Sequence, residues 1–208
     1  MSNLRSIGAA LGLAGMLIAP TVTANLIENG SFEQALILDQ SNGGWGYFLP
    51  SDVDGWDSDT NKIEIWDSGF NGVIAADGQR FAELNAHPET SGNAFTLFQE
   101  IDTIVNQIYH LTFAYRARVG NETFNVAAGN LALNIDNSNT DDWSVFSGMF
   151  MALSETTKLQ FTSVNPTTNT LGNFIDNVSI VAKVPEPGTL GLLGLGLVGL
   201  GIARKRKA

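Results

Sequence analysis

The chain contains no cysteine among its 208 residues. Disulfide bonds, thiol nucleophiles, thiolate metal sites and thiol redox chemistry are therefore excluded. A domain of about 160 residues does not depend on disulfides, because it buries roughly 70% of the surface that its unfolded chain exposes. An exported protein without cysteine is common in bacteria and unusual among small secreted eukaryotic proteins.

Basic residues are scarce in the central part of the chain. All 21 acidic residues lie between Glu28 and Glu186, where only six basic residues balance them, so this span has a formal charge of −15. The other five basic residues are Arg5 and the run 204–207. A surface this acidic repels phosphate backbones, so we expect no nucleic-acid binding.

Histidines are few, and common catalytic motifs are missing. The chain has neither Gly-x-Ser-x-Gly nor His-Glu-x-x-His. His110 falls on the polar side of an alternating run and His87 precedes Pro88, so both are interpreted as surface or hydrogen-bonding residues. A glycosidase needs two carboxylates at a set separation, and the sequence singles out no such pair. We predict that the protein is not an enzyme and keep a secreted hydrolase as the third hypothesis.

Residues 1–24 have the composition of a signal peptide. Arg5 supplies the positive start, 7–19 is apolar, and Pro20 ends the apolar run. The small residues at 22–24 predict that signal peptidase cuts before Asn25. An N-terminal membrane anchor is the alternative, but the apolar run is short for about 30 Å of hydrocarbon.

The C-terminus has a second apolar stretch. Residues 190–203 are apolar throughout, and the basic run 204–207 follows. As a helix this stretch would extend about 21 Å, which is short for a membrane span, although basic residues can snorkel and the bilayer can thin. The positive-inside rule keeps the basic run in the cytoplasm and the acidic domain outside. The signal peptide predicts the same orientation.

The motif Val184, Pro185, Glu186 and Pro187 precedes this apolar stretch. Motif, Gly/Leu-rich stretch and basic run together resemble the PEP-CTERM sorting signal, here residues 184–208. The resemblance implies recognition by an exosortase in the inner membrane of a Gram-negative bacterium. The domain would then pass to the cell surface or to an extracellular polysaccharide matrix, often in association with biofilm or exopolysaccharide production. A plain C-terminal transmembrane anchor is the alternative.

Residues 25–183 are predicted to form one all-β domain, since short alternating runs are separated by Gly, Asn, Asp and Ser. In the clearest run, 109–116, the residues Tyr109, Leu111, Phe113 and Tyr115 share one face. The other predicted strands are 25–32, 63–66, 80–84, 95–101, 130–135, 144–150, 158–162 and 174–181. This series indicates a β-sandwich, most simply a jelly roll.

The two ends of this domain carry a resemblance. The opening run 25–33 resembles the first strand of galactose-binding-like jelly rolls, and the closing run 174–180 resembles their last strand. Such folds include many carbohydrate-binding modules and a wall-associated family of unknown function. Residues 63–66 and 77–85 look like the middle part of that family. The resemblance implies that the two ends lie close together. The register of the closing run stays open, because either Phe174 or Ile175 can point inward with Val178 and Ile180.

The same resemblance implies a structural calcium ion. Related modules often hold Ca²⁺ with carboxylates and carbonyls of the first and last strands, and the ion takes about 6 to 8 oxygen ligands. By position Glu33 and Asp176 match best, and Asp77 is a third candidate. Alternatively, Glu33 and Asp176 accept hydrogen bonds from backbone amides at turns and strand ends.

Aromatic residues gather in a Gly-, Asp- and Asn-rich part of the chain. Sugars pack on exposed rings while polar side chains bond their hydroxyls. The candidate carbohydrate site is therefore Trp45, Tyr47, Trp56 and Trp66, with Arg80 among the neighbouring polar residues and Phe70 as a further ring. Burial in the core is the alternative, since most tryptophans are largely buried. We expect one or two of the five rings to be exposed.

The leading hypothesis is an exported, non-catalytic surface protein that binds carbohydrate or exopolysaccharide. The second is a structural or adhesive surface protein, for example of a biofilm, with no small ligand. Exposed rings between residues 45 and 70 would favour the first hypothesis, and a fully buried set would favour the second.

Overall fold

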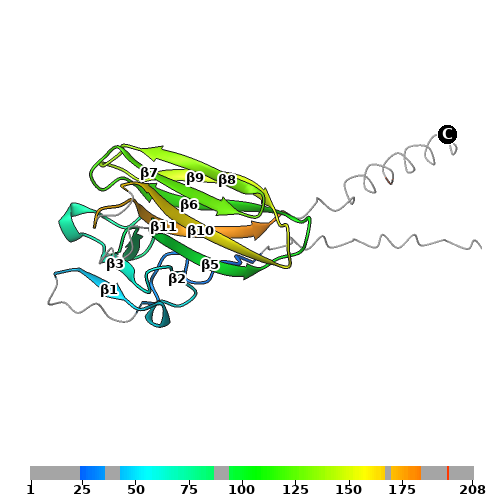
Figure 1. The fold of residues 1–208 in the computed structure, drawn as a ribbon, viewed down its shortest axis with the longest axis horizontal. Coiled ribbons are helices and arrows are strands. Elements are labelled where there is room, and N and C mark those ends of the chain that lie inside the picture. The colour runs from blue at the N-terminus through cyan, green and yellow to red at the C-terminus, as the bar shows by residue number, and fades with distance from the viewer. Residues whose placement is uncertain (1–23, 36–42, 87–93, 167–169, 184–195, 197–208) are drawn as a thin grey trace, which may run out of the picture.

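The computed structural model describes residues 24–35, 43–86, 94–166, 170–183 and 196, and its strands form two antiparallel sheets packed face to face (Figure 1). The six-stranded sheet has the order β1 (Trp45–Phe48), β3 (Ile63–Asp67), β4 (Arg80–Glu83), β11 (Phe174–Ala182), β6 (Ile108–Arg116) and β9 (Ser144–Met151). The five-stranded sheet has the order β2 (Asp57–Ser58), β5 (Thr96–Asp102), β10 (Thr156–Asn165), β7 (Glu122–Ala128) and β8 (Leu131–Asn137). Two short 3₁₀ helices, η2 (Pro50–Asp52) and η3 (Phe70–Gly72), lie in the loops. The predicted all-β jelly-roll sandwich is confirmed.

Alternating apolar side chains build the core between the sheets. On β6, Tyr109, Leu111 and Phe113 are all buried, as their shared face predicts. Across the core, the ring of Phe113 meets that of Phe161 edge to face at 4.9 Å. The period-2 pattern of the central strands therefore places their aromatic residues between the sheets.

A bulge settles the register of β11. The pairing with β6 shifts between Asp176 and Ser179, and Asn177 has a φ of 48°. The extra residue restores the inward direction, so Ile175 and Val178 both face the core although they are three positions apart. Phe174 points to the other face, where it joins a smaller apolar cluster.

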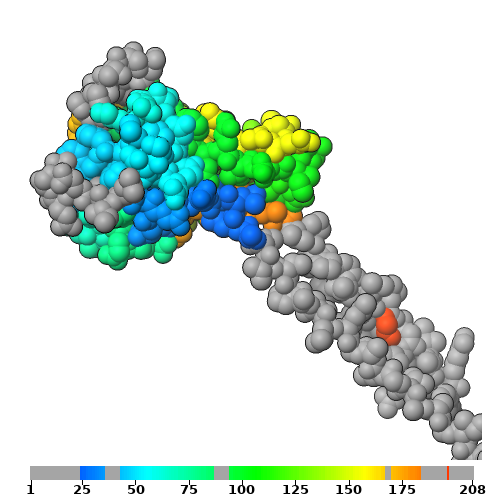
Figure 2. Space-filling view, turned by 90° about the horizontal axis from the view of Figure 1, so that it is seen from below, coloured from blue at the N-terminus to red at the C-terminus, as the bar shows by residue number. Residues whose placement is uncertain are grey.

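The opening run 25–32 is not a strand, which corrects the prediction. Asn29 and Phe32 have φ values of 51° and 57°, and residues in this left-handed region interrupt a pleated ladder. The run still follows β11, because Leu26 N–H donates to the carbonyl of Ile180 at 2.8 Å. Figure 2 shows residues 24–35 in blue beside the orange of β11.

The predicted signal peptide, sorting motif and C-terminal helix lie outside the described residues, apart from residues 24 and 196. No helix in the described part of the chain combines the length and the hydrophobicity that crossing a bilayer requires.

Candidate functional site

Strands β1, β3 and β4 present alternate side chains on the face of the six-stranded sheet that points away from the core. Ile63 and Ile65 of β3 are core residues, so Glu64 and Trp66 between and beside them face outward. The register of the strand pairing then aligns two rows of outward-facing residues across the three strands. One row is aromatic, Trp45, Trp66 and Phe81, and the next is Tyr47, Glu64 and Glu83.

The aromatic row is the centre of a second, smaller apolar cluster. Trp66 packs against Phe174 at 4.9 Å and against Phe70 at 4.8 Å between ring centroids. Phe70 comes from η3 and covers the outer side of the sheet. Trp66 is 2% exposed, so it forms a floor and not an open platform.

This arrangement leaves a hollow of about 510 Å³, which we call the aromatic hollow. It is lined by Trp45, Tyr47, Glu64, Trp66, Phe70, Asn71, Arg118 and Thr170. Trp45, Tyr47 and Phe70 are half-buried, and the rings of Trp45 and Tyr47 meet edge to face at 5.1 Å. The hollow therefore offers partly open rings around a buried polar floor.

Glu64 and Arg118 are the charged residues of that floor, and the buried Glu83 pairs with Arg118. Arg118 Nη1 donates to both oxygens of Glu83, at 2.8 and 2.9 Å, and the guanidinium lies 4.7 Å above the ring of Trp66. Gly172 N–H also donates to Glu83 Oε1 at 2.9 Å. Glu64 Oε1 accepts the indole N–H of Trp66 at 2.9 Å. Arg118 thus joins the two rows and neutralises Glu83, which is fully buried.

Glu64 and Glu83 are cross-strand partners, and both carboxyl groups are buried. Glu64 Oε2 has no hydrogen-bond partner among the described residues, so a proton on Glu64 would reside there. Burial raises the pKa of Glu64 to about 7, against the effects of Trp66, Glu83 and Arg118. Burial, and then the charge of Glu64, raise the pKa of Glu83 as well, while Arg118 and the Gly172 N–H lower it. The pair therefore retains a proton near neutral pH.

The structure brings Trp45, Tyr47 and Trp66 together but not the other two candidates. Trp56 is buried in the main core, where its indole N–H donates to the carbonyl of Asn29 at 3.0 Å. Arg80 alternates with Phe81 and so points to the opposite face of β4. Its guanidinium pairs with Asp67 at 3.6 Å and donates to the carbonyl of residue 35 at 2.7 Å. Neither residue lines the aromatic hollow.

The calcium candidates surround the loop at 75–80. Glu33 Oε1 accepts the backbone N–H groups of residues 79 and 80 at 2.7 and 2.8 Å. Asp176 Oδ2 accepts those of residues 76 and 77 at 2.7 and 3.0 Å, and burial raises the pKa of Asp176 to about 7. Among the described residues, no three His, Asp or Glu side chains converge on a common point. These contacts match the alternative role of amide acceptor, and calcium stays a prediction.

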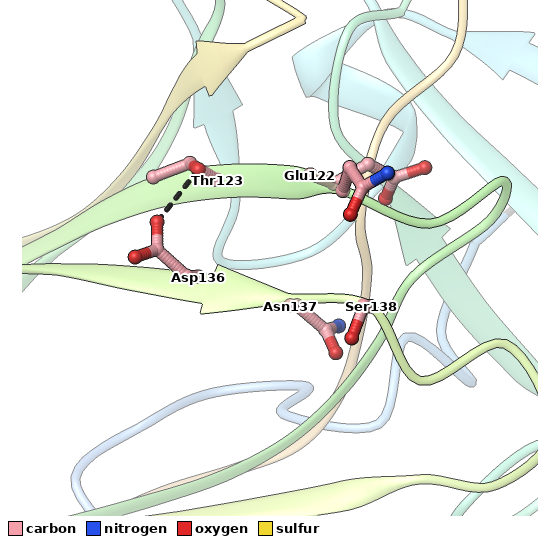
Figure 3. Close-up of a pocket in the computed structure, with 6 residues that line it drawn as sticks. Glu122, Thr123, Asp136, Asn137 and Ser138 are labelled. Carbon is pink, nitrogen blue, oxygen red and sulfur yellow. Dashed lines mark hydrogen bonds between the residues drawn. The ribbon is translucent and has the colours of Figure 1, made fainter.

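A second hollow of about 310 Å³ lies at the ends of β7 and β8 (Figure 3). Thr123 and Asp136 point toward each other in the figure, and the hydroxyl donates to Asp136 Oδ1 at 2.8 Å. Glu122 accepts backbone N–H groups of residues 118 and 119, and Asn137 donates to Asn173 at 3.0 Å. This hollow has no aromatic lining, and its polar groups largely satisfy one another. It is the weaker candidate for a ligand site.

Sequence reasoning missed Arg118, Asn71 and Thr170 as members of the hollow. Arg118 follows β6 in a loop and carries no motif. One signal was available, since Arg118 is one of only six basic residues in the acidic span. A basic residue so outnumbered is a reasonable partner for a buried carboxylate.

Comparison with protein families yields two matches. The family described as protein of unknown function DUF642 matches residues 25–181. The PEP-CTERM protein-sorting motif matches residues 183–207. No curated protein matches the chain.

Comparison with solved structures finds proteins of low sequence identity. The arabinose-bound α-L-arabinofuranosidase MgGH51 is similar over 79% of this chain and 27% of its own, with 10% identity and a TM-score of 0.56. TmCBM61 in complex with β-1,4-galactotriose covers 77% of this chain and 100% of its own, with 12% identity and a TM-score of 0.47. A CBM4 structure is similar over 76% of this chain and 99% of its own, with 19% identity and a TM-score of 0.45. The likeness to the arabinofuranosidase supports the sandwich fold and nothing further.

Proposed function

The chain belongs to the DUF642 family and carries a PEP-CTERM sorting motif, and from this premise we propose that it is a non-catalytic bacterial surface protein that binds carbohydrate in the aromatic hollow. One observation carries the proposal. Three half-buried rings, of Trp45, Tyr47 and Phe70, line one hollow whose floor holds Glu64 and Arg118.

This combination suits a sugar chemically. The C–H faces of a pyranose pack on aromatic rings, while fixed polar groups bond its hydroxyls. Protonated Glu64 can donate a hydrogen bond. Arg118 Nη1 is occupied by Glu83 and the carbonyl of Thr170, but Nε and Nη2 have no partner among the described residues. With Glu83 and Arg118 balancing each other, the floor is neutral, and a neutral glycan is the expected ligand.

The carboxyl pair also supports a binding role over hydrolysis. Glu83 is fully buried and paired with Arg118, whereas a glycosidase holds two carboxyl groups on either side of the bond that it cleaves. Arg118 and Gly172 hold Glu83 away from solvent. Glu83 is therefore not placed to flank a glycosidic bond.

Sorting follows from the C-terminal motif. We propose that an exosortase recognises the motif at 184–187 in the inner membrane of a Gram-negative bacterium and removes the tail. The acidic domain, with its formal charge of −15, would then reside at the cell surface or in an exopolysaccharide matrix. A structural or adhesive role is the second candidate, favoured by the burial of Trp56 and Trp66.

The test is titration of the purified full chain with a panel of neutral and acidic polysaccharides, followed by tryptophan fluorescence and calorimetry. The double substitution Trp45→Ala and Tyr47→Ala should weaken binding by roughly tenfold or more, because stacking on each ring is lost. Phe98→Ala is the matched control, since Phe98 is a half-exposed ring on the other sheet, beneath Lys158. A flat response of the unmodified chain across the panel, or equal losses in both variants, contradicts the proposal.

A further inference from the structure

Exposed apolar side chains gather at one end of the sandwich. Ile104 and Val105 lie between β5 and β6, Ile108 begins β6, and Leu153 lies between β9 and β10. Their exposed fractions are 69, 43, 43 and 60% in that order. We call these four residues the apolar tip. They are four of the ten large apolar side chains that are exposed in the described residues, so this end is enriched in them.

The two loops of the tip are fastened to each other by backbone hydrogen bonds. Thr103 N–H donates to the carbonyl of Glu155 at 2.8 Å, and Asn106 N–H donates to that of Ala152 at 2.9 Å. Ala152 N–H returns a bond to the carbonyl of Gln107 at 3.0 Å. The exposed side chains are therefore presented by an ordered backbone.

The tip adjoins the point where the sorting segment begins. Lys183 N–H donates to the carbonyl of Ile108 at 2.9 Å, and Gln107 Nε2 donates to the carbonyl of Lys183 at 2.8 Å. The sorting motif follows directly, and the apolar stretch starts at Leu190. The six intervening residues span at most about 20 Å, so a membrane that holds the apolar stretch lies within reach of the tip.

The aromatic hollow lies at the opposite end of β11. Phe174, which starts this strand, contacts Trp66 at the hollow, and Ala182 ends it beside Lys183. Nine residues of strand extend over roughly 25 Å. Figure 1 shows β11 running from the end that carries β1 and β3 to the other end of the sandwich.

We propose that the apolar tip rests on a zwitterionic lipid bilayer while the sorting segment is still attached, so that the aromatic hollow faces away from the membrane. This inference rests on the sorting half of the proposed function and is independent of carbohydrate binding. Asp102 and Glu155 flank the tip and are exposed, so the contact is shallow and disfavours anionic lipid. The sorting segment supplies the attachment, and the tip sets the orientation.

The absence of cysteine allows a direct test with single-cysteine variants of the full chain. Leu153→Cys reports on the tip, and Gly196→Cys reports on the apolar stretch. Ile74→Cys is the matched control, with 64% exposure far from the tip. Each variant carries an environment-sensitive dye in phosphatidylcholine vesicles that contain shallow nitroxide-labelled lipid. We expect blue-shifted emission and lipid quenching at 153 and 196, and emission as in water at 74.

The outcomes separate the inference from its premise. Quenching at 196 without quenching at 153 overturns the tip contact alone, and no quenching at 196 overturns the membrane premise together with the tip. A further outcome is that emission at 153 shifts to the blue as the protein concentration rises, without quenching by the labelled lipid. That result indicates contact with a second copy of the chain and overturns the proposed membrane contact. Adding Ile104→Ser and Val105→Ser, both at exposed positions, should reduce quenching at 153 roughly twofold if the apolar contact orients the domain.

Discussion

Glu64 of β3 and Glu83 of β4 are cross-strand partners, and both carboxyl groups are buried at the aromatic hollow. Water is nearly excluded from both, at 3% and 0% exposure, so the two cannot readily be ionised together. Arg118 balances one negative charge, and a proton must balance the other. The protonation state of the polar floor of the hollow therefore depends on pH.

Glu64→Gln should weaken the pH dependence of stability. The pKa of Glu64 is raised by burial to about 7, so the folded state binds more protons than the unfolded state between pH 4.5 and 7, and stability falls as the pH rises through this window. At pH 8 the variant should be more stable than the unmodified chain by on the order of 2 kcal/mol, or roughly 5 °C in Tm. At about pH 4 the two should differ little, since Glu64 is protonated in both states.

Thermal melting from pH 4 to 8 measures this effect. Glu100→Gln is the control, because Glu100 is exposed and forms only a surface pair with Lys158. Asp176 retains its own dependence of the same sign, so some slope should persist. Parallel slopes for Glu64→Gln and the unmodified chain would show that Glu64 does not titrate in this window.

Arg118→Met should destabilise the domain, because it leaves Glu83 buried without a counter-charge. The expected loss is about 3 kcal/mol at pH 8 and less at pH 5, where Glu83 can take up a proton. Adding Glu83→Gln should recover part of the loss. Chemical denaturation of the two single variants and the double variant gives the coupling energy, and strict additivity would contradict the pairing.

Trp56→Ala and Trp45→Ala should have different effects, because Trp56 is a core residue and Trp45 lines the aromatic hollow. Trp56 packs on Phe32 and Phe161 in the core, so its loss should cost about 3 to 5 kcal/mol. Trp45 is half-buried at the hollow, so its loss should cost about 1 kcal/mol and mainly reduce glycan binding. Denaturation and glycan titration of both variants check this, and the reverse ranking in either measurement would refute the assignment.

Changes in the sorting motif should keep the tail on the protein. Pro185→Ala with Pro187→Ala removes the residues that the motif resemblance assigns to exosortase recognition. In cells that contain the exosortase, the intact mass of the protein should then include the C-terminal segment, and less protein should reach the surface. Thr189→Ala, just beyond the motif, should be processed normally. Equal processing of both variants would argue against recognition at this motif.

Calcium remains to be tested by ion removal. A bound ion would compete for the carboxylate oxygens of Glu33 and Asp176, which now accept hydrogen bonds from backbone N–H groups. If calcium is held there, excess calcium should raise the Tm of the full chain relative to EDTA, and Asp176→Asn should abolish the rise. Equal melting temperatures with calcium and with EDTA would contradict the prediction.

Alternation predicted most of the fold. Eight of the nine predicted runs are strands, because side chains on a half-buried strand must alternate between core and solvent. The opening run is the exception, since positive φ values at Asn29 and Phe32 break it although its composition resembles a first strand. Strands β1, β2 and β7 were missed; in β7 only Phe124 and Val126 are large apolar residues, so its alternating pattern is short.

By itself the sequence determined the sorting motif, the acidic character and the inward face of clearly alternating strands such as β6, since all of these depend on residues near one another in the chain. Only the tertiary structure decided which aromatic residues meet. Trp45 and Trp66 adjoin because β1 pairs with β3 in one register, whereas Trp56 enters the core. Arg118 reaches Glu83 from 35 positions away. Such contacts depend on long-range strand pairing, and no local pattern in the sequence records it.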